Sequence, residues 1–169
     1  NLLQNKRLDF IMFSYSPSNQ FDFQQINLDT IEVELEEYKV HRLYMDPVVC
    51  VMAGNHPLSL QETVTLQDIS NYKQTAYSND ASYITDRGFL HVSTNTKIHQ
   101  QFMKHEGTVC CLPFRTFLSL FPQKEFTCKF ITGIEPVTVY LICRRDMYQD
   151  KEAIYQHFIN TAISLCQYG

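Results

Sequence analysis

The pattern of apolar and polar positions divides the chain into short buried strands separated by polar turns. Two continuous apolar runs rich in β-branched residues, 47–53 and 137–143, predict central strands with both faces buried. A shorter apolar run within residues 8–17 predicts another buried strand of the parallel type. Over residues 31–36, apolar side chains alternate with glutamates, which predicts an edge strand.

Helical periodicity appears between these strands and after the last of them. Residues 96–106 are amphipathic and are followed by Gly107, a residue that commonly ends a helix. Residues 151–167 carry one apolar stripe and predict the clearest helix of the chain. A shorter helix is predicted near residue 66, capped by Thr63 or Thr65. Helices that alternate with strands in this way are typical of an α/β fold with mostly parallel pairing.

The stretch Gly54-Asn55-His56-Pro57-Leu58 places several turn residues directly after the strand at 47–53. We interpret it as the place where the chain leaves one lobe for another. The two central strands bracket a self-contained α/β middle of roughly 75 residues, which is close to the size of a small domain. The sequence therefore predicts two lobes joined by two passing strands.

Charge and composition narrow the function classes. The chain has 14 basic and 18 acidic residues, a net charge of −4, and no basic cluster longer than two residues. Such a surface does not favour binding to a phosphate backbone, so we do not expect this chain itself to bind nucleic acid. No apolar stretch approaches 18 residues, which excludes an ordinary membrane helix. The first residues carry neither an initiator methionine nor a signal peptide, and we expect the chain to be part of a longer protein.

The cysteines and the absent motifs argue against catalysis. Cys50, Cys143 and Cys166 lie in apolar periodic segments, where cysteine behaves as a small buried hydrophobe, and we expect a reduced, cytoplasmic compartment. Cys110 and Cys111 are neighbours on a predicted strand, so their side chains point to opposite faces. The sequence has no H-x-x-x-H, Cys-x-x-Cys, G-x-S-x-G or phosphate loop, and it predicts no metal site, no cofactor and no enzyme.

Four segments in order carry a resemblance to a known family: "LLQNKRLDFIMF", "VVCVMAGNHPLSLQETVTLQDI", "STNTKIHQQFMKHEGTVCCLPF" and "VYLICRRDMYQDKEAIYQHFI". They resemble the effector-binding domain of LysR-type transcriptional regulators. The resemblance implies a two-lobed α/β fold like a type 2 periplasmic binding protein, with two crossover strands and a ligand cleft between the lobes. Lobe I would comprise residues 1–58 and 134–169, and lobe II residues 59–133. The domain's first strand and first helix, and a DNA-binding winged helix-turn-helix, are expected upstream and are absent from this sequence.

Candidate ligand-binding residues follow from the places where the predicted strands end. In open α/β sheets, ligands bind beyond the carboxyl ends of the strands, where loops and helix N-termini present hydrogen-bonding groups. These ends are small, polar and rich in hydroxyls, which suits the carboxylate or amide of a small metabolite. Serines, threonines and asparagines there also serve as simple caps and turns. The candidates are Ser14, Tyr15, Ser16, Ser78, Asn79, Thr94, Asn95, Pro113 and Phe114.

The resemblance implies a regulatory function for the chain. A small-molecule effector would bind in the cleft, rearrange the lobes and change the geometry of a homodimer or homotetramer that binds DNA only through the missing N-terminal domain. Two alternatives remain open at this point. One is a stand-alone solute-binding protein of the same fold, and the other is a thiol-based redox sensor that acts through Cys110 and Cys111. We favour buried packing of these two cysteines over a redox role.

Overall fold

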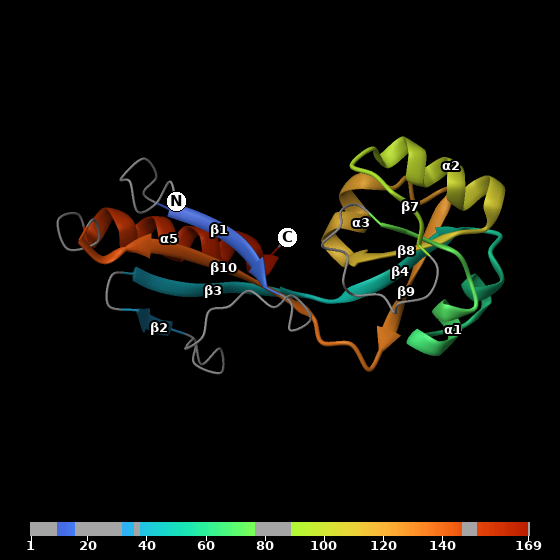
Figure 1. Ribbon diagram of the computed structural model, residues 1–169. Helices are drawn as coiled ribbons and strands as arrows, with labels where there is room; N and C mark the ends of the chain where they lie inside the picture. The colour runs from blue at the N-terminus through green and yellow to red at the C-terminus, as the bar shows by residue number, and fades with distance from the viewer. Residues whose placement is uncertain (1–9, 16–31, 36–37, 77–88, 147–151, 169) are drawn as a thin grey trace. The chain divides into compact units, whose positions relative to one another are not determined.

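The computed structural model describes residues 10–15, 32–35, 38–76, 89–146 and 152–168. The chain divides into two compact units, and most of their elements are labelled in Figure 1. Unit 1 contains the described residues up to Met45 and those from Val137 onward, and unit 2 contains Asp46–Pro136. In the part of the chain that the structure describes, no helix has the length and apolar character needed to cross a membrane.

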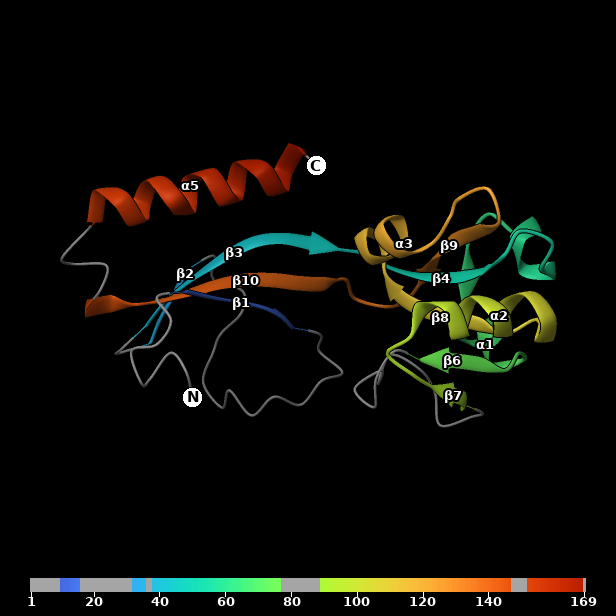
Figure 2. The same ribbon diagram turned by 90° about the horizontal axis from the view of Figure 1, so that it is seen from above.

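Unit 1 is a four-stranded sheet with helix α5 (Glu152–Tyr168) along one face, as Figure 2 shows. The helix packs Tyr155 and Ile159 against apolar side chains of the sheet, among them Leu141. Strand β1 pairs antiparallel with β10, and β2 pairs antiparallel with β3. In the order in which they lie in the sheet, the strands are β1 (Phe10–Tyr15), β10 (Val137–Arg144), β3 (Tyr38–Asp46) and β2 (Glu32–Leu35).

Unit 2 is built around a six-stranded sheet in which β4 is fully buried. In spatial order the strands are β5 (Val64–Thr65), β9 (Phe126–Thr132), β4 (Val48–Ala53), β8 (Val109–Pro113), β6 (Gln74–Ala76) and β7 (Phe89–Val92). The helical segments are the 3₁₀ helix η1 (Pro57–Leu60), α1 (Leu66–Ser70), α2 (Thr96–Glu106) and α3 (Phe114–Leu120).

The core of unit 2 lies between its sheet and helices α2 and α3. Val49 and Val51 project from β4 into this layer, where they meet Met103 of α2 and Phe117 of α3. Phe126 of β9 completes the cluster, and its side chain is among the largest that are fully buried in the described residues. This packing fixes the direction in which α2 and α3 leave the sheet, and hence the position of their N-termini.

Most of the local predictions are confirmed where the structure describes them. The strand predicted within residues 8–17 is present as β1, but it is an edge strand with Met12 64% exposed, and the prediction that it is buried is wrong. Both strong apolar runs are interior strands of their sheets, and β2 is an edge strand. Thr65 caps α1 through a capping box with Asp68, and Gly107 ends α2 with a left-handed φ of 61°.

The predicted strand directions are wrong for most described pairs. Strand β1 runs antiparallel to β10, and β4 runs antiparallel to both of its neighbours, β8 and β9. Only β5 with β9, and β6 with β7 and β8, are parallel among the described pairs. A continuous apolar run reports burial on both faces of a strand, and this burial does not depend on the direction of the neighbouring strand.

The predicted boundary between the two lobes also needs correction. The division lies between Met45 and Asp46, and not after Leu58, and its second part lies between Pro136 and Val137. Strand β4 therefore belongs to unit 2, where it pairs with β8 and β9. The Gly54–Leu58 stretch is a turn inside unit 2, and the η1 helix that it begins packs on β4 and β9. Glycine and proline mark the end of a strand, but they do not show which body the strand belongs to.

Candidate functional site

The predicted site residues of unit 2 lie along one edge of its sheet. Strand β6 is parallel to β7 and to β8, with Ala76 in register with Val92 and Thr75 in register with Cys110. The three strands therefore leave the sheet at the same edge. Thr94 and Asn95 follow β7, while Pro113 ends β8 and Phe114 begins α3. Ser78 and Asn79, which follow β6, and Ser16 lie outside the described residues.

The loop that enters α2 is held by a chain of short hydrogen bonds. Ser93 N–H donates to the carbonyl of Ala76 over 3.0 Å, and Asn95 N–H donates to Ser93 Oγ over 3.0 Å. Asn95 Oδ1 in turn accepts from the N–H of Lys97 over 3.0 Å, which makes Asn95 the cap of α2. The buried side chain of His99 also contacts this loop, because its Nε2 lies 2.8 Å from the carbonyl oxygen of Ser93. Thr94 and Asn95 are exposed on this fixed loop.

The N-terminus of α3, at the same edge, already holds a protein carboxylate. Arg115 N–H donates to Asp46 Oδ1 over 3.2 Å, and Phe114 N–H donates to the Pro47 carbonyl over 2.9 Å. Burial raises the pKa of Asp46, while the backbone hydrogen bonds from Arg115 and Phe114 and the charge of Arg115 act in the opposite direction. Sequence reasoning missed Asp46, because its partner on α3 is 69 residues away and no local pattern connects them.

The aromatic residue at this edge contributes surface and no charge. Phe114 is partly buried against the core, and its ring centroid lies 5.6 Å from that of Phe130 and 6.3 Å from that of Phe117. Pro113, just before it, has extended backbone and supplies no side-chain cap to α3. These two predicted residues are therefore apolar, and they lie at the same end of the parallel strands as the polar loop at Thr94 and Asn95.

Ser14 and Tyr15, the remaining described candidates, lie in unit 1 near the end of β1. They are in register with Val139 and Thr138 of β10, and Ser14 is exposed. Their position at the end of a strand agrees with the reasoning that selected them. Their participation in a ligand site stays a prediction.

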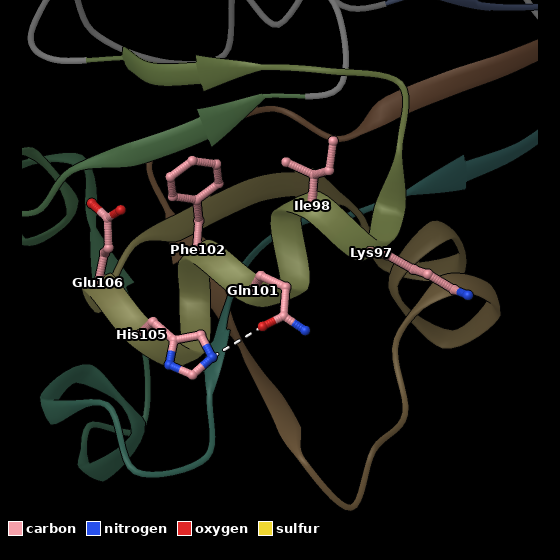
Figure 3. Close-up of a pocket in the computed structure, with 6 residues that line it drawn as sticks. All are labelled: Lys97, Ile98, Gln101, Phe102, His105 and Glu106. Atoms are coloured by element: carbon pink, nitrogen blue, oxygen red, sulfur yellow. Dashed lines mark hydrogen bonds between the residues drawn. The ribbon is translucent and has the colours of Figure 1, made fainter.

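A shallow pocket of about 330 Å³ lies on the outer side of α2, as shown in Figure 3. Its lining residues all come from this one helix, and they are Lys97, Ile98, Gln101, Phe102, His105 and Glu106. Ile98 and Phe102 point to the same side of the helix, and His105 Nε2 lies 3.0 Å from Gln101 Oε1. A small-molecule site normally gathers polar groups from several elements, so we do not assign the effector to this pocket.

The turn His56-Pro57-Leu58 lies in one of the four segments that carry the family resemblance, and it has a structural role in unit 2. His56 Nδ1 accepts from the N–H of Leu58 over 3.2 Å, which caps η1, and Nε2 lies 3.2 Å from the carbonyl of Gly107 at the end of α2. Because Nδ1 accepts, Nε2 carries the proton and donates. The ring also packs on Tyr72, with 4.5 Å between centroids. Burial lowers the pKa of His56, which keeps the imidazole neutral near pH 7.

Cys110 and Cys111 do not form a reactive pair. Burial raises the pKa of Cys110, and the interaction with Cys50, together with burial, raises the pKa of Cys111. Cys110 lies in the core cluster under α2 and α3, while Cys111 points to the other face. A thiol of this kind is poorly ionised and therefore a slow nucleophile. The preference for buried packing is supported, and the redox role of Cys110 with Cys111 is not. Among the described residues, no group of three or more His, Cys, Asp or Glu is placed to hold a metal.

The chain forms two α/β units. It passes from one to the other between Met45 and Asp46 and returns between Pro136 and Val137. This is the periplasmic-binding-protein-like fold of LysR-family regulatory domains. Solved structures show this directly. The regulatory domain of MetR from N. meningitidis matches 99% of this chain and 74% of its own, with a TM-score of 0.65 and 16% identity. The reduced regulatory domain of OxyR from Pseudomonas aeruginosa matches 99% of this chain and 76% of its own, with a TM-score of 0.69 and 13% identity.

Full-length OxyR from the same bacterium matches 98% of this chain, which spans 51% of that protein, with a TM-score of 0.68 and 15% identity. No protein-family model and no curated protein matches the sequence. The predicted fold is therefore confirmed by structural likeness at low sequence identity.

Proposed function

We propose that this chain is the effector-sensing regulatory domain of a LysR-type transcription factor. The observation that supports the proposal is the common edge of unit 2, where parallel strands lead into exposed hydroxyl and amide groups, in a chain with the fold of LysR-family regulatory domains. A small molecule that binds one arrangement of the two units more tightly shifts the population toward it. In a longer protein that carries a winged helix-turn-helix, this shift controls DNA binding and transcription.

The proposed effector is a small metabolite with a carboxylate that binds at Thr94 and Asn95. The N-terminus of α2 favours negative charge, because its peptide dipoles and N–H groups point toward this loop. The N-terminus of α3 is less suitable for an anion, since Asp46 already occupies it. Pro113 and Phe114 would then cover the apolar part of the ligand. Ser14, Tyr15, Ser16, Ser78 and Asn79 remain proposed ligand-binding residues.

A thermal-shift screen with amino acids and organic acids tests the proposal. A ligand at 100 times its Kd adds about 2.7 kcal/mol to the free energy of unfolding, which raises the melting temperature measurably. Asn95→Asp is the matched variant, because aspartate caps a helix as well as asparagine does but repels a carboxylate. We expect this variant to keep the unliganded melting temperature and to lose the response. A panel without any response, or an Asn95→Asp variant that responds like the wild type, would contradict the carboxylate site.

We further propose that the protein is a cytoplasmic homodimer or homotetramer. An exposed apolar row on α5 supports self-association: Ile154, Phe158 and Leu165 are 67%, 47% and 71% exposed, and their spacing places them on one side of the helix. Sedimentation equilibrium of the wild type and of Leu165→Glu would test it. Self-association that weakens in Leu165→Glu agrees with the proposal, and a monomeric wild type at high concentration contradicts it.

A stand-alone solute-binding protein of the same fold would bind a ligand in the same way. DNA binding by the longer protein separates the two functions. If the chain extends into a winged helix-turn-helix and its DNA affinity changes with the ligand found in the screen, the regulator is supported. If the ligand binds and no DNA-linked effect exists, the solute-binding function replaces it.

A further inference from the structure

Cys50 and Cys111 lie directly opposite each other on neighbouring strands. They are register partners in the antiparallel pair of β4 with β8. Directly opposed residues of such a pair have Cα atoms about 4.5 or 5.5 Å apart, and both separations fall in the range of about 4.4–6.8 Å found for disulfides. Their side chains also leave the sheet on the same face. The backbone therefore already has the spacing that a cross-strand disulfide requires.

The two thiols face each other inside unit 2. The interaction with the side chain of Cys50, together with burial, raises the pKa of Cys111. The exposed fractions of the two residues are 0% for Cys50 and 5% for Cys111. Both are free thiols in the structure. Two cysteines that leave the sheet on the same face, from strands of fixed register, can bring their sulfur atoms within bonding distance by rotation of their side chains.

The other cysteines of unit 2 are placed differently. Cys110 points to the opposite face, into the cluster with Val49 and Val51. Cys110 and Cys128 are both register partners of Val51, on the two strands that flank β4. Two strand spacings separate them, about 9.5 Å, which is too far for a disulfide without movement of the backbone. The geometry thus selects one pair in this unit.

We propose that Cys50 and Cys111 form a cross-strand disulfide when the protein meets a peroxide. One thiolate attacks the O–O bond of hydrogen peroxide, which gives a sulfenic acid and releases hydroxide that takes up the thiol proton as water. The second sulfur then displaces the sulfenic hydroxyl as another water. In total, two thiols and one hydrogen peroxide give one disulfide and two waters. This modification is independent of the proposed effector function.

Burial determines the rate of this reaction. A buried thiol with a raised pKa is rarely ionised and meets little peroxide, so oxidation of the folded protein requires local opening of β4 and β8. We therefore expect the disulfide to form over hours and to resist small thiol reductants in the folded state. It would act as a lasting link between β4 and β8, in contrast to the exposed, acidic thiols of fast sensors.

Peptide mapping of the 169-residue chain after treatment with hydrogen peroxide tests the proposal. Free thiols are blocked in denaturant, and the protein is cut with trypsin without reduction. The expected product joins the peptide 43–73, which contains Cys50, to the peptide 105–115, which contains both Cys110 and Cys111. The thiol count in denaturant should fall from six by two. Fragmentation of the linked peptide in the wild type assigns the bond to Cys111, so the assignment does not depend on whether any variant folds.

Matched serine variants sharpen the result. Cys110→Ser changes the adjacent cysteine on the other face and should retain the linked peptide, whereas Cys111→Ser and Cys50→Ser should lose it. Oxidation should raise the melting temperature of the wild type and of Cys110→Ser only. The proposal is overturned if Cys50 remains reduced after prolonged oxidation, if it links to Cys110, or if the same peptide appears in Cys111→Ser.

Discussion

His56 offers the sharpest test of how unit 2 is held together. Its ring caps η1 through Leu58 and donates to the carbonyl of Gly107, so it joins the turn after β4 to the end of α2. His56→Ala removes both hydrogen bonds and the contact with Tyr72. His56→Asn keeps a side-chain oxygen for the cap but is too short to reach Gly107. The two variants therefore separate the cap from the connection between the segments.

The expected losses follow from the contacts of this ring. A lost cap costs about 1 kcal/mol, a lost hydrogen bond about 1 kcal/mol, and a lost aromatic contact about 0.5–1.5 kcal/mol. We expect His56→Ala to lower the free energy of unfolding by about 2–4 kcal/mol. His56→Asn should lose about 1 kcal/mol less than His56→Ala, because it retains the cap. These are large fractions of the total stability of a small domain.

The pH dependence provides an independent check. Burial lowers the pKa of His56 below its usual 6.5, so as the pH falls through 6.5 the unfolded chain takes up a proton that the folded chain resists. The contribution of His56 to the free energy of unfolding is fully present above about pH 6.5. It decreases as the pH falls toward the pKa that His56 has in the folded state. Urea unfolding followed by circular dichroism at several pH values between 5 and 8 should show this slope. If His56→Asn keeps the full slope of the wild type, His56 is not the group responsible.

Three further substitutions test single features of unit 2. Thr65→Ala should lower the free energy of unfolding by about 1 kcal/mol through loss of the cap, while Thr63→Ala, at an exposed position without this role, should change it little in the same urea assay. Gly107→Ala should cost about 1–2 kcal/mol, because φ is 61° and an added Cβ meets no other atom, so the loss is due to the backbone alone. Asp46→Asn keeps an acceptor for Arg115 N–H and removes a charge whose burial raises the pKa. Because the folded state binds this proton more readily than the unfolded chain, the variant should be at least as stable as the wild type at pH 7, and its advantage should shrink toward pH 4; a clear loss at pH 7 would contradict this.

The features predicted well from the sequence depend on neighbours within one helical turn. Thr65 and Asp68 are three residues apart, and their reciprocal hydrogen bonds form wherever the chain turns into a helix. Asn95 and Gly107 mark the two ends of α2 for the same local reason. Such contacts need no knowledge of the rest of the fold, so a single sequence is sufficient to find them.

The features that were predicted wrongly or missed depend on long-range contacts. The apolar run that became β4 showed burial on both faces, but its direction and its unit are set by β8 and β9, which lie far along the chain. The carboxylate at the start of α3 comes from Asp46, and the group that His56 meets belongs to Gly107. In each case the sequence supplied the right chemical group, and only the fold supplied its partner.

The cysteines of β8 show why this distinction matters for chemistry. Strand alternation correctly separates Cys110 from Cys111, but it does not say which strand lies opposite either of them. The register of β4 with β8 makes Cys111 the partner of Cys50. A slip of one residue would bring Cys110 opposite Cys50 and would turn every side chain of β8 to the other face, so that the core under α2 and α3 would change its composition. The identity of the cysteine that links to Cys50 therefore reports the register of the central strands, and one peptide map tests the packing of unit 2 together with its oxidation.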